Sequence, residues 1–581
     1  MSSSPRGSHG RGSDVDGFGT SSGIFFRTSA ALDPASLPTL SESVAGTSSV
    51  QLLGVDEAAP DYLVRYPVSE RFAAAPRPYG APNLLSVVPL RGVPLPPKSR
   101  YAVVLTRALR DAAGAPLATA AAVVQLSAGN APPGMSSAAL DAHGAALLAL
   151  ESAGMARSDV AAITVFTTGS PTETLGTAIA TARATAAPAP NAPFTLTDEF
   201  PSSCVYATTV DMPVYQPGEP PFSEEGGGFA LDEAGQPVLQ AKERARFVLT
   251  VPRATMPAAG FPLVVFSRTG AGCDRPIVDR GVHAEPGGEA VTPGSGPALE
   301  FARAGFAGAS IDGPHGGLRN VTKSDEQLLV FNLKNPVAVR DNVRQSALEL
   351  ALVPDILEGV QLDVAGCAGA SASGAIAKFD TDTLAIMGHS VGATIAPLAL
   401  VFEPRYKVAV GKRARRSAHL WPVRRAGAHH TGLPRHVLMM QGVVDHYIMP
   451  PIANAASLSF GLDLAGAALD AAKPELVSLT PLEALLPLVG RGSIALPAAH
   501  NATSTDGTPA TAVVTHTLED GIEDGHEVVF QTETPKHAYA CFLAGPANGA
   551  HRAAARQGRR RWRLAVAVRS SHGGPRSRIW A

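Results

Sequence analysis

The stretch that decides the fold is residues 384–400, which read LAIMGHSVGATIAPLAL. A short apolar run ends in Gly388-His-Ser-Val-Gly392, and small apolar residues typical of a helix follow. This is the pattern G-x-S-x-G between a strand and a helix, the context in which it indicates a nucleophile elbow. The sequence therefore predicts a sharp turn that presents the hydroxyl of Ser390 at the edge of a sheet.

The glycines of this motif explain its spacing. A glycine two residues to either side of Ser390 lets the strand and the helix approach without a Cβ clash, while the serine takes strained backbone angles. The backbone N–H of Val391 then lies at a helix N-terminus and can donate to an oxyanion. Because 57 of the 581 residues are glycine, a structural turn that happens to carry a serine is the alternative interpretation.

Length and composition indicate a globular protein of several domains. The chain has 581 residues, of which 45% are hydrophobic and 17% charged, which suits a packed core and not a disordered chain. No apolar run reaches the roughly 18 residues of a membrane-spanning helix. The first twenty residues are rich in Ser, Gly and Arg, so no signal peptide is predicted. The four cysteines are Cys204, Cys273, Cys367 and Cys541. They allow up to two disulfides and fit no metal-binding spacing.

The formal net charge is −2, but basic residues are concentrated in two segments. Residues 411–435 hold seven Lys/Arg and residues 551–581 hold nine Arg, and neither segment contains an acid. Three interpretations are open: a basic patch for nucleic acid or anionic lipid, solvated or disordered sequence, and translation in another reading frame of the gene. We favour the third, and we expect no nucleic-acid partner.

The pattern along the chain divides it into five parts. Residues 1–30 are expected to be disordered. Residues 31–130 are expected to form a small all-β, Ig-like sandwich, because short strands recur between Pro/Gly turns. Its predicted strands are residues 62–66, 83–88, 101–106 and 121–126. The remaining parts are an α/β connecting segment and linker over 131–195, a catalytic domain over 196–548 and a basic disordered tail over 549–581.

From about residue 196 strands and helices alternate, which predicts an α/β domain with a mostly parallel sheet. Its predicted strands are residues 205–210, 246–251, 262–267, 306–311, 383–387, 408–410, 436–441 and 511–517. Its predicted helices are residues 297–304, 340–358, 392–402 and 450–461. Ser390 then follows the fifth strand counted from residue 246, provided that one intervening strand is not recognised in the sequence.

A serine nucleophile needs a base, and the base needs an orienting acid. Asp445 is the candidate acid, because it follows strand 436–441 in a loop at the carboxyl edge of the sheet. An N-cap or turn role is its alternative. His526 is the candidate base, because it lies after the last strand in an acidic, Gly-containing loop that looks mobile. His516, at the end of that strand, is the rival base, and His446 is expected to support Asp445 or to lie at the surface.

The oxyanion hole needs a second N–H from the loop after an early core strand. Residues 261–267 are that strand, and Arg268-Thr-Gly-Ala-Gly272 is the loop. Either Thr269 or Gly270 is the expected donor, and the sequence does not choose between them. The segment Asp312-Gly-Pro-His-Gly-Gly317 is expected to shape the mouth of the site, with a structural turn as its default interpretation.

With these residues placed, the chain resembles a two-part family of bacterial lipases and esterases, in which an Ig-like N-terminal region precedes an α/β-hydrolase domain. The segments that carry the resemblance are LDPASLPT at 32–39, TVFTT at 164–168, GFAG at 305–308, DGPHG at 312–316, GHSVG at 388–392 and GVVD at 442–445. The resemblance implies hydrolysis of carboxylic esters of small-molecule or lipid substrates without a metal or cofactor. It also implies export, often as a lipoprotein, and it leaves open peripheral contact with a lipid surface.

The chain departs from that family in three places. Arg268-Thr269 stands where many hydrolases have His-Gly, residues 411–434 are short and basic where a cap insertion is expected, and no signal peptide is predicted. Two other classes of function remain open: a peptidase or acyltransferase with the same triad, and an inactive hydrolase-fold surface or adhesion protein.

Overall fold

The computed structural model describes residues 15–78, 80–267, 275–412, 435–503 and 507–545. Its largest element is an eleven-stranded sheet with the order β19-β18-β22-β17-β16-β15-β11-β12-β10-β9-β8. The strands are β8 (Thr195–Glu199), β9 (Ser203–Val214), β10 (Ala241–Pro252), β11 (Phe261–Ser267), β12 (Ala307–Ile311), β15 (Phe379–His389), β16 (Tyr406–Lys412), β17 (His436–Val443), β18 (Asp463–Ala465), β19 (Ser493–Ile494) and β22 (Ala512–Leu518).

The centre of this sheet is parallel. From β12 through β11, β15, β16 and β17 to β22, each strand pairs in parallel with the next, whereas β10 runs antiparallel to both β9 and β12. Because the carboxyl ends of parallel strands meet at one edge of a sheet, the loops that follow β15, β17 and β22 lie along the same edge. The sheet thereby brings together segments that are distant in the sequence.

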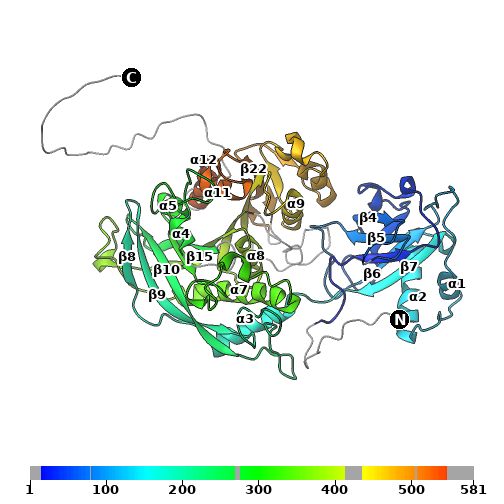
Figure 1. The fold of residues 1–581 in the computed structure, drawn as a ribbon, viewed down its shortest axis with the longest axis horizontal. Coiled ribbons are helices and arrows are strands. Elements are labelled where there is room, and N and C mark those ends of the chain that lie inside the picture. Colours follow the sequence, from blue (N-terminus) through cyan, green and yellow to red (C-terminus); the bar gives the residue numbers. More distant parts are fainter. Residues whose placement is uncertain (1–14, 79, 268–274, 413–434, 504–506, 546–581) are drawn as a thin grey trace, which may run out of the picture.

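Helices cover both faces of the sheet (Figure 1). Along β11 the side chains alternate: Leu263 and Val265 pack in the cluster that holds α3 (Glu173–Thr185), α7 (Pro336–Leu357) and α8 (Gly392–Phe402). Val264 and Phe266 pack in the cluster that holds α4 (Pro276–Asp279), α5 (Pro297–Arg303), α11 (Val528–Gln531) and α12 (Glu533–Ala544). A continuous apolar run is what a strand buried on both faces requires. Among the described residues, no helix combines the length and the apolarity needed to cross a membrane.

All eight strands and all four helices predicted from residue 196 onward are present, with their ends shifted by a few residues. One count was wrong. Between β10 and β15 the large sheet contains only β11 and β12 in the described part of the chain, so Ser390 follows the fourth strand from β10. The strand that makes β15 the fifth is β9, which precedes β10. The two short strands β13 (Leu362–Asp363) and β14 (Ile376–Ala377) form a separate pair.

The N-terminal part contains two small sheets, with the orders β1-β5-β4 and β3-β2-β6-β7. Their strands are β1 (Ile24–Arg27), β2 (Val50–Gly54), β3 (Arg65–Tyr66), β4 (Val68–Ala73), β5 (Leu84–Pro89), β6 (Arg100–Thr106) and β7 (Val160–Thr167). Strand β7 lies in residues 131–195, the predicted connecting segment, and it completes the four-stranded sheet.

The strand predicted at residues 121–126 was wrong, because this segment forms helix α1 (Ala121–Ser127). Val123 and Leu126 are buried and Val124 is exposed, which is the spacing of a helix face. Helix α2 (Ser137–Ser152) packs beside α1 over the same sheet. The N-terminal part is therefore not all-β as the Ig-like prediction required.

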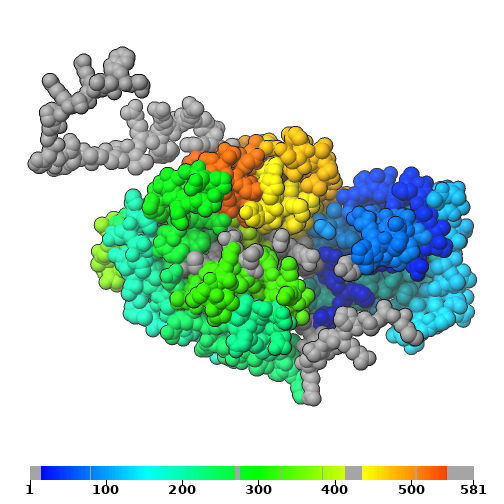
Figure 2. Space-filling view, in the orientation of Figure 1, coloured from blue at the N-terminus to red at the C-terminus, as the bar shows by residue number. Residues whose placement is uncertain are grey.

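The N-terminal part packs against helix α9 (Pro450–Ser459), which begins shortly after the predicted acid (Figures 1 and 2). One apolar cluster joins Val103 of β6 to Leu458 of α9 and to Met439 of β17. Gly92 lies so close to the helix that a Cβ there would sit 2.4 Å from the Ala455 carbonyl oxygen. The N-terminal part thus supports the helix behind the candidate acid.

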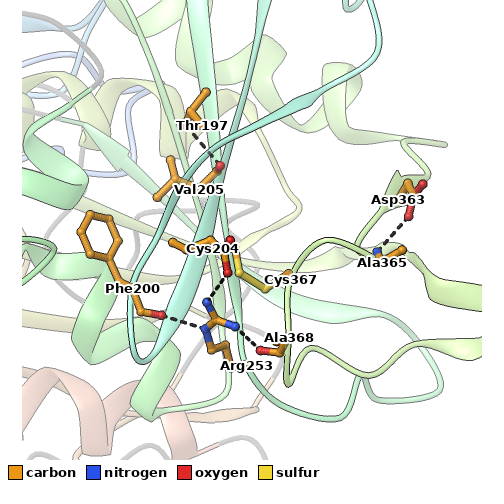
Figure 3. The surroundings of a disulfide bond; sticks show 10 residues. Thr197, Phe200, Cys204, Val205, Arg253, Asp363, Ala365, Cys367 and Ala368 are labelled. Carbon is orange, nitrogen blue, oxygen red and sulfur yellow. Dashed lines mark hydrogen bonds and ion pairs between the residues drawn. A yellow bond between two sulfur atoms is a disulfide. The ribbon is translucent and has the colours of Figure 1, made fainter.

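A disulfide between Cys204 and Cys367 joins β9 to the segment after β13 (Figure 3). Arg253, at the end of β10, donates to the Phe200 carbonyl at 2.7 Å and also to the Ala368 carbonyl. These contacts tether residues 360–378 to the outer strands of the sheet. The two cysteines are 163 residues apart in the sequence, so the crosslink closes a long loop of the unfolded chain.

We expect that the variant Cys204→Ala/Cys367→Ala loses about 2–5 kcal/mol of unfolding free energy, because a crosslink across a long loop restricts the unfolded state. Chemical denaturation of the oxidised protein and the variant measures this difference. Cys541→Ala is the matched control, since Cys541 is a free cysteine, and it should unfold like the parent. Equal midpoints for the parent and the double variant would show that the bridge does not stabilise the fold.

Candidate active site

Ser390 lies at the junction between β15 and α8 with a φ of +54°. A residue with a side chain is strained in this left-handed region, by about 1–2 kcal/mol. A Cβ on Gly388 would lie 2.6 Å from the carbonyl oxygen of Gly392, so this position of the motif requires glycine. The elbow predicted from the sequence has the backbone geometry that a nucleophile elbow needs.

The predicted oxyanion donors are only partly described. Val391 is the N-cap of α8, which is the place expected for a backbone donor at a helix N-terminus. Ser267, the last residue of β11, pairs with Gly388, so the chain leaves β11 next to the elbow. Thr269 and Gly270 lie outside the described residues.

Asp445 and His526 are in contact. Asp445 Oδ2 lies 3.0 Å from His526 Nδ1, and both side chains are buried. The other carboxylate oxygen, Oδ1, accepts from the backbone amides of Tyr447 at 2.9 Å and Ile448 at 2.7 Å. A histidine that donates from Nδ1 has Nε2 as its acceptor nitrogen. In this arrangement Nε2 of His526 is the ring nitrogen that can accept a proton.

Two glycines allow the acid loop and the base loop to touch. A Cβ on Gly442 would lie 1.8 Å from the Gly525 carbonyl oxygen, and a Cβ on Gly525 would lie 2.8 Å from the Val443 carbonyl oxygen. Val444, just before Asp445, has a φ of +65°. From the sequence, Gly442 marks the end of an apolar strand, and its close contact with a residue 83 positions later could not be inferred.

The loop that carries His526 is fastened by its acidic side chains. Glu523 Oε1 accepts from His283 Nδ1 at 2.6 Å and from the Gly287 amide at 2.8 Å. Glu527 accepts two hydrogen bonds from Arg280, at 3.0 Å and 2.6 Å. The sequence made this loop look mobile, because the partners that hold it lie some 240 residues earlier in the chain.

His446 and Asp524 form a third link. Asp524 Oδ2 lies 2.6 Å from His446 Nδ1, while Asp524 Oδ1 accepts from the His526 amide at 2.7 Å. The hydrogen bond that His446 donates to Asp524 is the main reason why the pKa of His446 is raised above its usual value, and the charges of Asp524, Asp445 and Glu519 add to it. His446 thus contacts the loop that carries His526.

His389 connects the elbow to the base. Its Nε2 lies 2.9 Å from the His526 carbonyl oxygen, and the two imidazole centroids are 4.8 Å apart. No hydrogen bond joins Ser390 Oγ to His526 among the bonds of these two described residues. Catalytic hydrogen bonds commonly tighten only in the complex with substrate.

The rival base His516 belongs to a different cluster. Its Nδ1 lies 3.6 Å from Asp470 Oδ1 and accepts from the Leu469 amide at 3.2 Å. Its side chain is fully buried. The structure brings His526, and not His516, to Asp445.

The predicted turn at 312–317 is braced from inside. The buried Asp312 accepts from the amides of Arg246 and Leu318, both at 3.0 Å. His315 Nε2 lies 3.2 Å from Asn342 Oδ1 on α7, and burial lowers the pKa of His315. These contacts agree with the default interpretation of the segment as a structural turn.

His389, His526 and Glu527 form the only group of three potential metal ligands found in the described ranges, with ligand atoms within 4.8 Å of one another. Two of them are already engaged, Glu527 by Arg280 and His526 Nδ1 by Asp445. A cation here would have to compete with an arginine, and we assign no metal to this group.

No protein-family model matches the chain, and no curated protein matches it. Solved structures of esterases align with it at low similarity. Acetyl xylan esterase 1 from Thermoanaerobacterium sp. is 12% identical over 60% of this chain and 89% of that chain, with a TM-score of 0.30. A CE15 glucuronoyl esterase from Teredinibacter turnerae is 14% identical over 62% and 77%, with a TM-score of 0.30. A glucuronoyl esterase from Solibacter usitatus is 12% identical over 64% and 91%, with a TM-score of 0.29. Identities and TM-scores this low do not carry an activity over to this chain.

We expect Gly442→Ala to lower kcat by at least about ten-fold, because the new methyl group forces the acid and base loops apart and a small misplacement of a catalytic group is costly. Gly411→Ala, on the neighbouring strand β16, is the control, because a Cβ there meets nothing within 4 Å. Ester hydrolysis and thermal unfolding of both variants measure the effect. A Gly442→Ala protein with the activity of the control would contradict the close contact between the two loops.

Proposed function

We propose that this chain is a serine hydrolase that cleaves carboxylic esters, with Ser390 as nucleophile, His526 as general base and Asp445 as the orienting acid. The observation that carries the proposal is the buried contact of 3.0 Å between His526 and Asp445, joined through His389 to the elbow that holds Ser390 at a φ of +54°. These residues follow β15, β17 and β22, whose ends share one edge of the sheet. Their order in the chain, Ser-Asp-His, is the order of α/β hydrolases.

The sheet supports an α/β-hydrolase fold for the catalytic part. It is parallel at its centre, with β10 antiparallel to both of its neighbours, and helices cover both faces. The nucleophile follows a central strand and opens a helix, as the elbow of that fold does. The fold alone hosts many chemistries, and the side chains at the edge of the sheet are what favour acyl transfer.

The proposed reaction has two steps. In the first, His526 takes the proton of Ser390 as Oγ attacks the ester carbonyl carbon, and the alcohol leaves with that proton as the acyl-enzyme forms. In the second, water gives a proton to His526 and attacks the acyl carbonyl, and His526 returns that proton to Ser390 Oγ as the acid is released. Asp445 stabilises the imidazolium, and the amides of Val391 and of Thr269 or Gly270 would hold the oxyanion.

The surroundings of His526 favour an ester with an apolar portion. The ring of Tyr447 lies 4.9 Å from the imidazole, and Tyr447 and Met449 are both exposed. An exposed aromatic ring beside the base can pack against an acyl or alcohol group. We also propose that the protein is exported, because a disulfide such as Cys204–Cys367 persists in an oxidising compartment.

An inactive adhesion protein is the less favoured alternative. A binding role does not require a carboxylate to be buried against an imidazole next to a strained serine, since burying a charge is costly unless it is paired. A peptidase or acyltransferase would use the same groups, and a panel of p-nitrophenyl esters, peptides and alternative acyl acceptors separates these activities.

We expect Ser390→Ala to reduce ester hydrolysis on the order of 10³-fold or more while the protein stays folded. Hydrolysis of p-nitrophenyl acetate and butyrate measures the rate, and labelling with a fluorophosphonate followed by peptide mapping should find the label on Ser390. Ser152→Ala, on the exposed surface of α2, is the control and should keep the parent rate. A Ser390→Ala protein that hydrolyses both esters normally would refute the proposal.

A further inference from the structure

The backbone of His526 is held by side chains on both sides. Its amide donates to Asp524 Oδ1 at 2.7 Å, and its carbonyl oxygen lies 2.9 Å from His389 Nε2. The imidazole is held separately, through Nδ1, by Asp445. The main chain and the ring of one residue are therefore restrained by three different side chains, from three parts of the sequence.

We infer that His389 and Asp524 are positioning residues that set where the imidazole of His526 lies relative to Ser390. They act through the backbone of His526 and need no contact with the substrate. This inference rests on the proposed function, because it assigns to His526 the task of moving a proton between Ser390 and a leaving group.

His389 is placed to tie the base to the nucleophile. It directly precedes Ser390 at the end of β15, it is fully buried, and its ring packs against His526 and against Phe530 at 4.6 Å. Because Nε2 donates to a carbonyl oxygen, that nitrogen carries the proton. Any displacement of the His526 loop away from the elbow would break this hydrogen bond inside the protein, where an unsatisfied carbonyl is costly.

Asp524 restrains the other side of His526 and is itself held by His446. Asp524 is the side-chain cap of the short helix Gly525–Glu527 that contains His526. Its second oxygen pairs with His446, whose side chain is 77% exposed. Such an exposed pair is screened by water, so its contribution is small. His389 is expected to be the stronger restraint and the His446–Asp524 pair the weaker one.

The weaker restraint depends on pH. Asp524, Asp445 and Glu519 surround His446 and favour its protonated form, which raises its pKa, while Lys473 neutralises part of Glu519 at 3.0 Å. The charged pair is present below the raised pKa of His446 and is lost as the pH rises through it. Removal of His446 should therefore matter at low pH and cease to matter at high pH.

The first test compares His389→Phe with His389→Gln. Phenylalanine keeps a ring against Phe530 but has no donor, whereas glutamine supplies an N–H of similar reach. We expect His389→Phe to lower kcat about ten-fold, which is the value of one buried hydrogen bond, with KM changed less than about two-fold. His389→Gln should recover a substantial part of that loss. Fluorophosphonate labelling of Ser390 should slow in parallel with kcat.

The second test does not depend on a buried position. Asp524→Ala removes the acceptor of the His526 amide, while Asp524→Asn keeps an oxygen there and loses only the charge. The alanine variant should lose more kcat than the asparagine variant. In His446→Gln, the ratio of parent to variant kcat should fall towards one as the pH rises.

Several outcomes would overturn the inference: a His389→Phe protein with the kcat of the parent, equal losses in His389→Phe and His389→Gln, equal losses in the two Asp524 variants, or a His446→Gln deficit that grows with pH. If the His389 variants do not fold, the comparison of Asp524→Ala with Asp524→Asn tests the inference alone. A failure of the proposed function is recognised separately. It would show as normal activity in Ser390→Ala, whereas an inactive Ser390→Ala together with normal His389→Phe and Asp524→Ala would sink the positioning roles only.

Discussion

The contact between the buried carboxylate of Asp445 and the imidazole of His526 is the constraint on which the site depends. A carboxylate at this depth would be costly without partners, and its partners here include one imidazole nitrogen and the amides of Tyr447 and Ile448. Those amides fix the direction of the carboxylate that faces the histidine. The acid therefore selects the tautomer of the imidazole, and the remaining contacts only have to bring that imidazole to the serine.

The imidazole of His526 is brought towards Ser390 by backbone contacts as much as by side-chain contacts. Gly442 and Gly525 let the loops after β17 and β22 touch, and Glu523 and Glu527 anchor the second loop to the segment that follows the predicted oxyanion loop. Ser390 and Val444 both have positive φ angles, each at the carboxyl end of a strand. Strain at two strand ends along one edge of the sheet persists only when the surrounding contacts over-determine the backbone, and these loop contacts do so.

The sequence predicted the parts of this arrangement that depend on local pattern and chain order. The elbow around Ser390 has its own motif, and Asp445 and His526 were found because each follows a strand of a parallel sheet. The fastening of the base loop was not predicted, since His283 and Glu523 are brought together by the fold and no spacing relates them. Helix α1 was not predicted because its local pattern is ambiguous. The segment from Ala121 to Leu126 is short and mostly apolar, and a run of that length suits either a strand or a helix until its buried face is known.

The N-terminal part packs on a helix next to the proposed site, which neither its sequence nor its fold class indicated. It packs on α9 through Leu458 and Gly92, and α9 starts at Pro450, five residues after Asp445. The amides that orient the Asp445 carboxylate belong to the turn between that aspartate and the helix. A surface that holds α9 in place therefore also holds the turn after Asp445. Only one short loop separates Asp445 from α9, so a shift of the helix would also move the aspartate. On this argument the N-terminal part supports the edge of the sheet that carries the proposed site, and loss of its packing would first displace Asp445.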